Sequence, residues 1–383
     1  MPFRVIDLFC GCGGLSCGFF QEGFEIIASI DSNAIALKTY QRNFPKTQIV
    51  NQDIRDIDPA DLRRLLKLQR GELDCLIGGP PCQGFSKNVV ATKRFLDDPR
   101  NKLMQVFISF VREFQPKTVL IENVAEIVKA YDGAVSNEIL SELQLDYSAD
   151  VRVLNAKEYG VPQSRRRAFF LASRMKDIVF PETLYKSAKK PMKREIQPSL
   201  FDEPEVQYVY VWDAISDLPH LENGEGENPC EYLVEPQTRY QAYIREPKLF
   251  TKQEQYLLHD HIARKLTPIQ YQRISSLKEG QSMPDLPEEL RARKGYSGAY
   301  GRLKPGDAAN TITKWVFHPG SGRFGHPYDN RVITIREAAR LQSLPDWFIF
   351  EGTYIQKSNQ VGEAVPSLLA RKLAASLATT LVR

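Results

Sequence analysis

FRVIDLFCGCGG, residues 3–14, is the stretch that decides the fold. Its first part, Phe3–Phe9, is mostly apolar, which is typical of a strand that is buried in a parallel sheet. Gly11, Gly13 and Gly14 then allow a tight turn into a helix, because glycine takes positive φ and lets a backbone approach a ligand closely. A Gly-rich turn after a strand indicates a nucleotide-type cofactor, although the signal is weak when it stands alone.

Two acidic residues follow further apolar stretches. Asp31 comes directly after the predicted strand Glu25–Ile30, near the distance at which dinucleotide-binding folds place the acid that binds ribose hydroxyls. It could equally be an acid at the start of the helix predicted over 33–40. Asp53 follows the apolar stretch 47–51, and its carboxylate could accept a hydrogen bond from an adenine amino group or belong to an ordinary loop.

A loop stiffened by glycine and proline, GGPPCQGFS at residues 78–86, follows the apolar run 73–77. Cys82 in this loop would lie at the end of a buried strand, where open α/β sheets place their chemistry. The alternative is a structural cysteine in a tight turn, because free cysteine is often buried and inert.

Charged residues also lie at or near strand ends later in the chain. The short strand predicted over 118–121 delivers Glu122, and a buried carboxylate must be paired, protonated or functional. Arg165 and Arg167 are two apart on an extended segment and therefore point to the same side. The alternative for these arginines is a basic strand edge that only prevents aggregation.

The alternation of strands and helices through residue 173 predicts a doubly wound, mainly parallel α/β sheet with helices on both faces. Strands are expected at 148–155 and 166–173, and a core helix at 101–114. From about residue 174 the composition becomes irregular, which indicates a second domain. Two later helices are predicted, one over 335–341 with a capping box from Thr334 and Glu337 and one over 367–381 that docks on the first domain.

Composition excludes several classes of protein. The chain has 383 residues, with 42% hydrophobic and 26% charged, and no apolar run approaches the roughly 20 residues of a membrane helix. The N-terminus lacks the pattern of a secretory signal, so a cytosolic protein is expected. Six cysteines show no metal-site or disulfide spacing. Two blocks, 160–200 and 290–340, each carry ten Lys/Arg against three Asp/Glu, which suggests a surface able to meet phosphate.

Several motifs occur in a fixed order: DLFCGCGG at 7–14, the loop at 78–86, ENV at 122–124, QSRRR at 163–167, REAARLQ at 336–342 and QVG at 360–362. This series closely resembles the DNA (cytosine-5)-methyltransferase family, of the bacterial modification type. The resemblance runs from residue 7 to about 370, with a long unmatched middle. One departure is Glu363, because the family usually has asparagine in that position.

The resemblance implies S-adenosylmethionine as cofactor, no metal, and double-stranded DNA as substrate. It implies that the cofactor is bound by residues of the glycine turn and the strand ends, namely Asp7, Phe9, Gly11, Gly13, Gly14, Asp31, Ser32, Asp53, Ile54 and Pro80. The implied catalytic residues are Cys82, Glu122, Arg165 and Arg167, and the implied DNA-binding residues are Gln83, Ser86, Arg165 and Arg167. Cys82 would attack C6 of a cytosine flipped out of the duplex.

The resemblance also implies a cofactor-binding catalytic domain at 1–173 plus about 352–383. A small domain at about 174–351 would contain the target-recognition region, about 174–300. We expect a monomer in a prokaryotic cytoplasm, associated with the nucleoid, which either works beside a cognate restriction endonuclease or is a solitary modification enzyme. Two alternatives remain: a tRNA cytosine-5 methyltransferase of the same fold, although the Cys-Phe-Thr tripeptide of that branch is absent, and a catalytically inactive DNA-binding relative.

Overall fold

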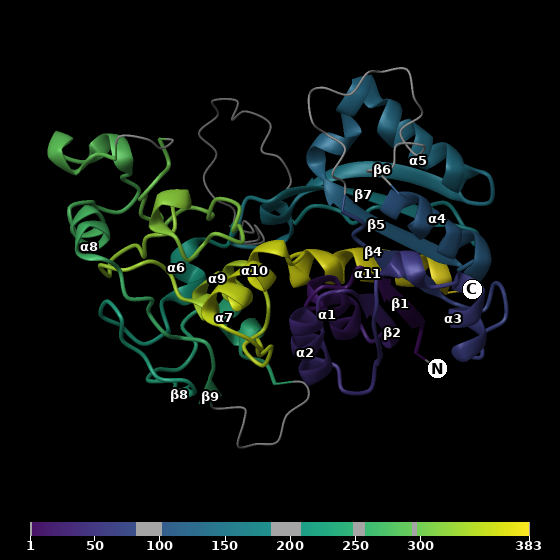
Figure 1. Cartoon of the computed structure of the whole chain (residues 1–383), viewed down its shortest axis with the longest axis horizontal. Helices are drawn as coiled ribbons and strands as arrows, with labels where there is room; N and C mark the ends of the chain where they lie inside the picture. The colour runs from purple at the N-terminus through teal and green to yellow at the C-terminus, as the bar shows by residue number, and fades with distance from the viewer. Residues whose placement is uncertain (1, 82–101, 185–207, 248–256, 293–296, 383) are drawn as a thin grey trace, which may run out of the picture.

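The computed structural model describes residues 2–81, 102–184, 208–247, 257–292 and 297–382. The main sheet has seven strands (Figure 1). They are β1 (Arg4–Leu8), β2 (Glu25–Asp31), β3 (Gln48–Asn51), β4 (Cys75–Gly78), β5 (Thr118–Val124), β6 (Ser148–Asn155) and β7 (Arg166–Ser173). Helices of the same part are α1 (Gly14–Gln21), α2 (Ala34–Asn43), α3 (Pro59–Leu65), α4 (Lys102–Phe114), α5 (Ala134–Gln144), α10 (Tyr354–Glu363) and α11 (Ser367–Leu381).

The strand order is β3-β2-β1-β4-β5-β7-β6, and β7 pairs antiparallel with both β5 and β6 while all other pairs are parallel. From β1 the chain adds β2 and β3 on one side of the sheet. The strands from β4 onward are added on the other side of β1. The order therefore reverses between β1 and β4. In open α/β sheets ligands bind beyond the carboxyl ends of the strands at such a switch point.

Helices cover both faces of the sheet, as the sequence predicted. One apolar cluster joins Val5, Ile77 and Phe169 to residues of α1, α2 and α11. The other joins the alternate strand residues, such as Ile6 and Leu76, to α3, α4 and α5. This division follows from the period of two in a strand, which sends neighbouring side chains to opposite faces.

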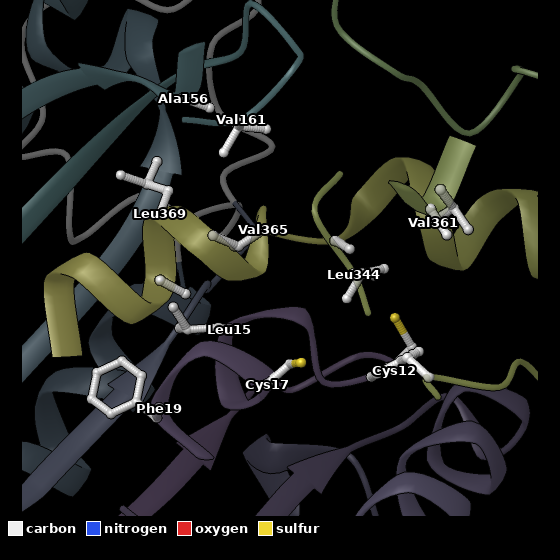
Figure 2. Packing of buried hydrophobic residues seen from close by; sticks show 14 of the residues in the cluster. Cys12, Leu15, Cys17, Phe19, Ala156, Val161, Leu344, Val361, Val365 and Leu369 are labelled. Atoms are coloured by element: carbon white, nitrogen blue, oxygen red, sulfur yellow. The ribbon is translucent and has the colours of Figure 1, made fainter. Parts of the chain in front are cut away.

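The C-terminal helix α11 docks on α1, in agreement with the prediction that the last helix docks on the first domain. Leu15 and Phe19 of α1 and Leu369 of α11 belong to one buried cluster (Figure 2). A side chain at Gly18 would overlap the backbone of Ser367 and Arg371. Glycine at position 18 therefore lets the two helices approach closely, and the end of the chain completes the fold that its beginning starts.

The predicted strands are confirmed, with small differences at their ends. β1 stops at Leu8 because Phe9 has φ 61, a left-handed conformation that breaks the ladder. β5 continues past the predicted end at residue 121, so Glu122 lies inside the strand and not just after it. The antiparallel partner β7 extends the ladder as far as Arg167, which pairs with Val124.

The described residues between β7 and α10 are irregular and lie beside the sheet, at the left of Figure 1. The α-helices among them are short: α6 (Val211–Ile215), α7 (Arg239–Ile244), α8 (Pro268–Ser275) and α9 (Ile335–Leu341). The two-residue strands β8 (Cys230–Glu231) and β9 (Leu257–Leu258) pair antiparallel. α9 has the predicted bounds and the predicted capping box between Thr334 and Glu337.

The second basic block does not form a phosphate-binding surface as a whole, which corrects the expectation from charge counting. Arg302, Arg331, Arg336 and Arg340 are all buried. Arg340 pairs with Asp217 and Asp346, and Arg331 pairs with Glu337. A buried guanidinium needs such partners because an unpaired charge away from water is costly. Much of this block therefore holds the small part together.

In the described ranges, none of the helices has the length and apolar character needed to cross a membrane.

Candidate active site

A cavity of about 760 Å³ lies at the switch point of the sheet. Residues at or just after the carboxyl ends of β1, β2, β3, β4 and β5 reach it from the large sheet, and residues 311–314 and the end of α10 line it as well. The predicted site residues that line it are Asp7, Phe9, Gly11, Gly14, Asp31, Ser32, Asp53, Ile54, Glu122, Arg165 and Arg167. The fold thus brings predicted cofactor residues and predicted catalytic residues to one cavity.

Asp31 at the end of β2 holds the glycine turn in place. Its Oδ2 accepts a hydrogen bond from the amide of Gly11 at 2.8 Å, and its Oδ1 accepts one from the amide of Asn33 at 2.8 Å. Each carboxylate oxygen retains a further lone pair that can accept from a ligand hydroxyl. The helix cap itself is Asn33, whose side chain accepts from the amides of Ile35 and Ala36, so Asp31 is not the cap of α2.

Asp53 is paired with a residue that the sequence did not single out. Arg55 donates to Asp53 from its amide at 3.0 Å and from Nε at 2.9 Å. These bonds from Arg55 lower the pKa of Asp53 to about 2. Asp53 therefore presents a carboxylate to the cavity at neutral pH, with Arg55 beside it on the cavity wall.

Asp7 lies at the base of the glycine turn, where it is almost fully buried. Its Oδ2 accepts a hydrogen bond from Ser16 at 2.6 Å, whereas its Oδ1 is buried without a hydrogen-bond partner. Burial raises the pKa of Asp7 to about 8, although the Ser16 bond opposes the rise. An acceptor left without a partner at a cavity wall is a place where a ligand donor can bind.

Glu122 and Arg167 form an ion pair on the cavity wall. The two side chains are mostly buried, and Arg167 Nε lies 3.0 Å from Glu122 Oε1. Burial raises the pKa of Glu122 above its ordinary value, while the charges of Arg167 and Arg165 oppose the rise. A Cβ at Gly79 would lie 3.1 Å from Glu122 Oε2. The loop that leads to Cys82 therefore begins against this carboxyl group.

Arg165 has an internal role. Its side chain is 3% exposed, and its two terminal nitrogens donate to the carbonyls of Ile312 at 2.9 Å and Gly362 at 3.1 Å. It thereby joins the sheet, the 311–314 segment and the end of α10 at the cavity wall. Its third nitrogen, Nε, is buried without a hydrogen-bond partner, and a contact between Arg165 and DNA stays a prediction.

Two of the predicted cofactor residues do not line the cavity. Gly13 precedes α1 and has φ 97, and a Cβ at this position would lie 2.8 Å from the Phe44 side chain. Glycine is therefore required here by the turn and by the close packing against Phe44. Pro80 is buried, and its carbonyl accepts from Asn123 at 3.0 Å. Cys82, Gln83 and Ser86 lie outside the described residues.

Three comparisons with known proteins agree on the family. The profile of the C-5 cytosine-specific DNA methylase family matches residues 3–379. This chain belongs to that family. It is therefore an enzyme that transfers a methyl group from S-adenosylmethionine to C5 of cytosine in DNA.

Relatives of similar length support the assignment. The chain is 34% identical to the Type II methyltransferase M.DdeI of Desulfomicrobium norvegicum, over 97% of this chain and 87% of that protein. It is 34% identical to M.AgeI of Thalassovita gelatinovora, over 98% of this chain and 99% of that protein. A solved structure from an E. coli prophage, assigned as a DNA modification methyltransferase, aligns with TM-score 0.75 at 28% identity and covers 99% of both chains.

The cavity of this C5 methylase fits its cofactor. Its volume lies within the roughly 300–1,000 Å³ of small-molecule sites. Two buried acceptors on its wall, Asp7 Oδ1 and Gln360 Oε1, are without hydrogen-bond partners in the described structure. S-adenosylmethionine carries an ammonium group and a sulfonium charge, which suit such acceptors. Asp31 and Asp53 add carboxylate oxygens that can accept hydrogen bonds from hydroxyl or amino groups of a ligand.

The sequence analysis missed one wall of this cavity. Residues 311–314, together with Gln360 and Glu363, complete the site. Gln163 holds Ile312 in position, because its side-chain oxygen accepts a hydrogen bond from the Ile312 amide at 2.8 Å. The partners are about 150 residues apart in the chain, so no local pattern could have joined them. Glu363 was noted only as a departure from the family, and it lies on the cavity wall.

Proposed function

We propose that this methylase acts on cytosine within a specific sequence of double-stranded DNA through a covalent bond between Cys82 Sγ and C6 of the base. The observation that carries the proposal is the Glu122–Arg167 pair, which faces the cavity where the loop to Cys82 begins. An inactive DNA-binding relative would have no need to keep a buried carboxyl and an arginine in this arrangement.

C5 of cytosine is too weak a nucleophile to take a methyl group directly. A thiolate at Cys82 would add to C6, because a thiolate is a strong nucleophile and also leaves well in the later elimination. Glu122, with its raised pKa, would hold a proton at N3 of the ring and neutralise the charge that develops there. Arg167 would orient Glu122 and donate to O2 of the base.

When bound, the cofactor would supply an electrophilic methyl group to C5 and would itself become S-adenosylhomocysteine. Loss of the C5 proton to a base would then restore the ring and expel Cys82 as the thiolate. The target lies inside a stacked duplex, so the base has to be flipped into the cavity, at a cost of a few kcal/mol.

We further propose a division into a catalytic domain, residues 1–173 plus about 352–383, and a small domain, about 174–351. The small part has an apolar cluster of its own, which includes Leu266, Ile274 and Val332. Residues of about 174–300 would read the target sequence in the major groove, where each base pair shows a distinct donor and acceptor pattern. Grafting this segment from a relative of different specificity should move methylation to that relative's site. A folded, active graft that keeps the original site would contradict the proposal.

The relatives named Type II methyltransferases support a role in restriction and modification. We propose that a cognate endonuclease accompanies the enzyme and that the enzyme works as a monomer on the DNA of a prokaryotic cytoplasm, at the nucleoid. DNA from cells that express it should resist the cognate nuclease, and light scattering should give the mass of one chain.

The direct test uses labelled S-adenosylmethionine. Label should enter duplex DNA and not tRNA, and bisulfite sequencing of DNA from expressing cells should reveal one recurrent sequence. Label in tRNA alone would favour the tRNA alternative. DNA binding without any transfer would favour an inactive relative.

A further inference from the structure

Trp315 is a large aromatic side chain that remains exposed beside the active-site cavity. Its exposed fraction is 54%, the largest of any described tryptophan. The segment 311–314 immediately before it lines the cavity. Single exposed apolar residues are common and need no explanation by themselves. The surroundings of Trp315 distinguish it from such residues.

The backbone that carries Trp315 is held firmly. Thr311 Oγ1 donates to the carbonyl of Ser164 at 2.9 Å, and Ser358 Oγ donates to the carbonyl of Lys314 at 3.0 Å. The Trp315 carbonyl accepts from Ser321 Oγ at 2.6 Å. The ring is thus presented to solvent from a fixed position, which reduces the entropy that a bound partner would have to remove.

The segment around Trp315 is suited to a polyanion. Residues 311–323, TITKWVFHPGSGR, contain no Asp or Glu. Lys314 and His318 are exposed on either side of Trp315. The Trp315 ring lies at 5.8 Å from that of Phe317, and Arg264 covers Phe317 at 4.9 Å from the ring centroid. Basic side chains with an aromatic ring between them are the combination that binds unpaired nucleobases and their phosphates.

We propose that Trp315 stacks on a nucleobase of the substrate DNA that becomes exposed when the target cytosine leaves the duplex. This inference rests on the proposed function, because flipping opens the base stack at the mouth of the cavity. The base could be the orphaned guanine or the neighbour of the target on its own strand. Both offer the same π-face.

The first experiment measures duplex binding by Trp315→Ala, Trp315→Leu and Trp315→Tyr. Loss of base stacking should weaken binding by roughly 5- to 150-fold in Trp315→Ala. Trp315→Leu should lose as much, because leucine fills space without stacking, while Trp315→Tyr should retain most of the affinity. S-adenosylmethionine affinity should not change in any of them. Equal binding by Trp315→Leu and wild type would overturn the inference.

Tyr328→Ala is the matched control. Tyr328 is 53% exposed, lies outside the proposed target-recognition region and is not among the residues that line the cavity. This variant should bind DNA like the wild type. An equal loss in both alanine variants would mean a general effect of removing a surface aromatic side chain and would also overturn the inference.

The second experiment identifies the base. Duplexes with an abasic site opposite the target, or beside it, should abolish the difference between wild type and Trp315→Ala at whichever position Trp315 contacts. A difference that survives both lesions would exclude stacking. Methyl transfer by the wild-type enzyme to the intact duplex is measured in parallel. Its failure would count against the proposed function, whereas wild-type transfer with no Trp315 effect would count against this inference alone.

Discussion

Arg167 lies diagonally across an antiparallel strand pair from Glu122, with Nε 3.0 Å from Oε1. Arg167 is opposite Val124 of β5. Glu122 lies two residues before Val124 on the same strand, so its side chain is on the same face of the sheet as that of Arg167. The pair therefore depends on β7 running antiparallel to β5. This one reversal in an otherwise parallel sheet places an arginine against the carboxyl group that we propose as the acid.

Glu122→Gln should slow methyl transfer by about 10²- to 10⁴-fold, the range of general acid catalysis. The pKa of Glu122 is raised by burial, so the protonated form persists to higher pH than for a free carboxyl, and activity should fall as pH rises through that pKa. The glutamine variant cannot titrate and should lack this fall. A pH–rate profile of both enzymes checks the prediction, and an identical alkaline fall in the variant would assign it to another group.

Cys82→Ser should abolish methyl transfer and leave S-adenosylmethionine binding nearly intact, because the thiolate acts on the base. Wild-type enzyme should be trapped covalently on DNA that carries 5-fluorocytosine, since fluorine cannot leave C5 as a proton does. Gel electrophoresis under denaturing conditions detects the adduct. Trapping of the serine variant would show that another residue is the nucleophile.

Asp31→Ala should weaken S-adenosylmethionine binding by about 10- to 150-fold, the range for one hydrogen bond to a charged group. Asp53→Ala should have a smaller effect, because Arg55 already shares that carboxylate. Calorimetry with the purified variants measures both affinities. Unchanged affinity in Asp31→Ala would limit Asp31 to holding Gly11 and Asn33.

Gly362→Ala should reduce turnover. The added methyl group would overlap backbone atoms of Thr313 and Lys314, and the segment that accepts from Arg165 would have to move. Gly306→Ala is the control, because a Cβ there meets nothing within 4 Å. Steady-state methylation assays compare the two. Equal kcat in both variants would show that the cavity tolerates movement of this wall.

Glu337→Gln should destabilise the protein by about 1.5–3 kcal/mol, because it removes one of the two carboxylates, Glu337 and Asp329, that pair with buried Arg331. Burial alone would raise the pKa of Glu337, but Arg331 and His326 lower it below the ordinary value. The stability that Glu337 contributes is therefore present above the pKa of Glu337 in the unfolded chain. It is lost as the pH falls through the lower pKa that Glu337 has in the folded protein. Urea unfolding at several pH values measures it.

The control for that variant is Glu351→Gln. The Arg42–Glu351 pair is exposed, with side chains 45% and 38% accessible, so its loss should cost less than about 1 kcal/mol. Equal losses in the two variants would mean that burial does not strengthen the Arg331–Glu337 pair.

The sequence by itself determined the strands, most of their bounds, the helices at 335–341 and 367–381, and the family. These follow from local periodicity, capping residues and motifs, each contained within a short window. It also placed Asp31 and Glu122 at the ends of predicted strands, which meet at one edge of the sheet because parallel strands end together.

Only the tertiary structure decided how distant residues are used. Arg165 and Arg340 look alike in a charge count, yet one holds the cavity wall through carbonyls and the other pairs with Asp217 and Asp346 in the interior. The 311–314 wall depends on Gln163, far away in the chain. The energy of a charge depends on its burial and its partners, and both are set by long-range packing that no local sequence pattern specifies.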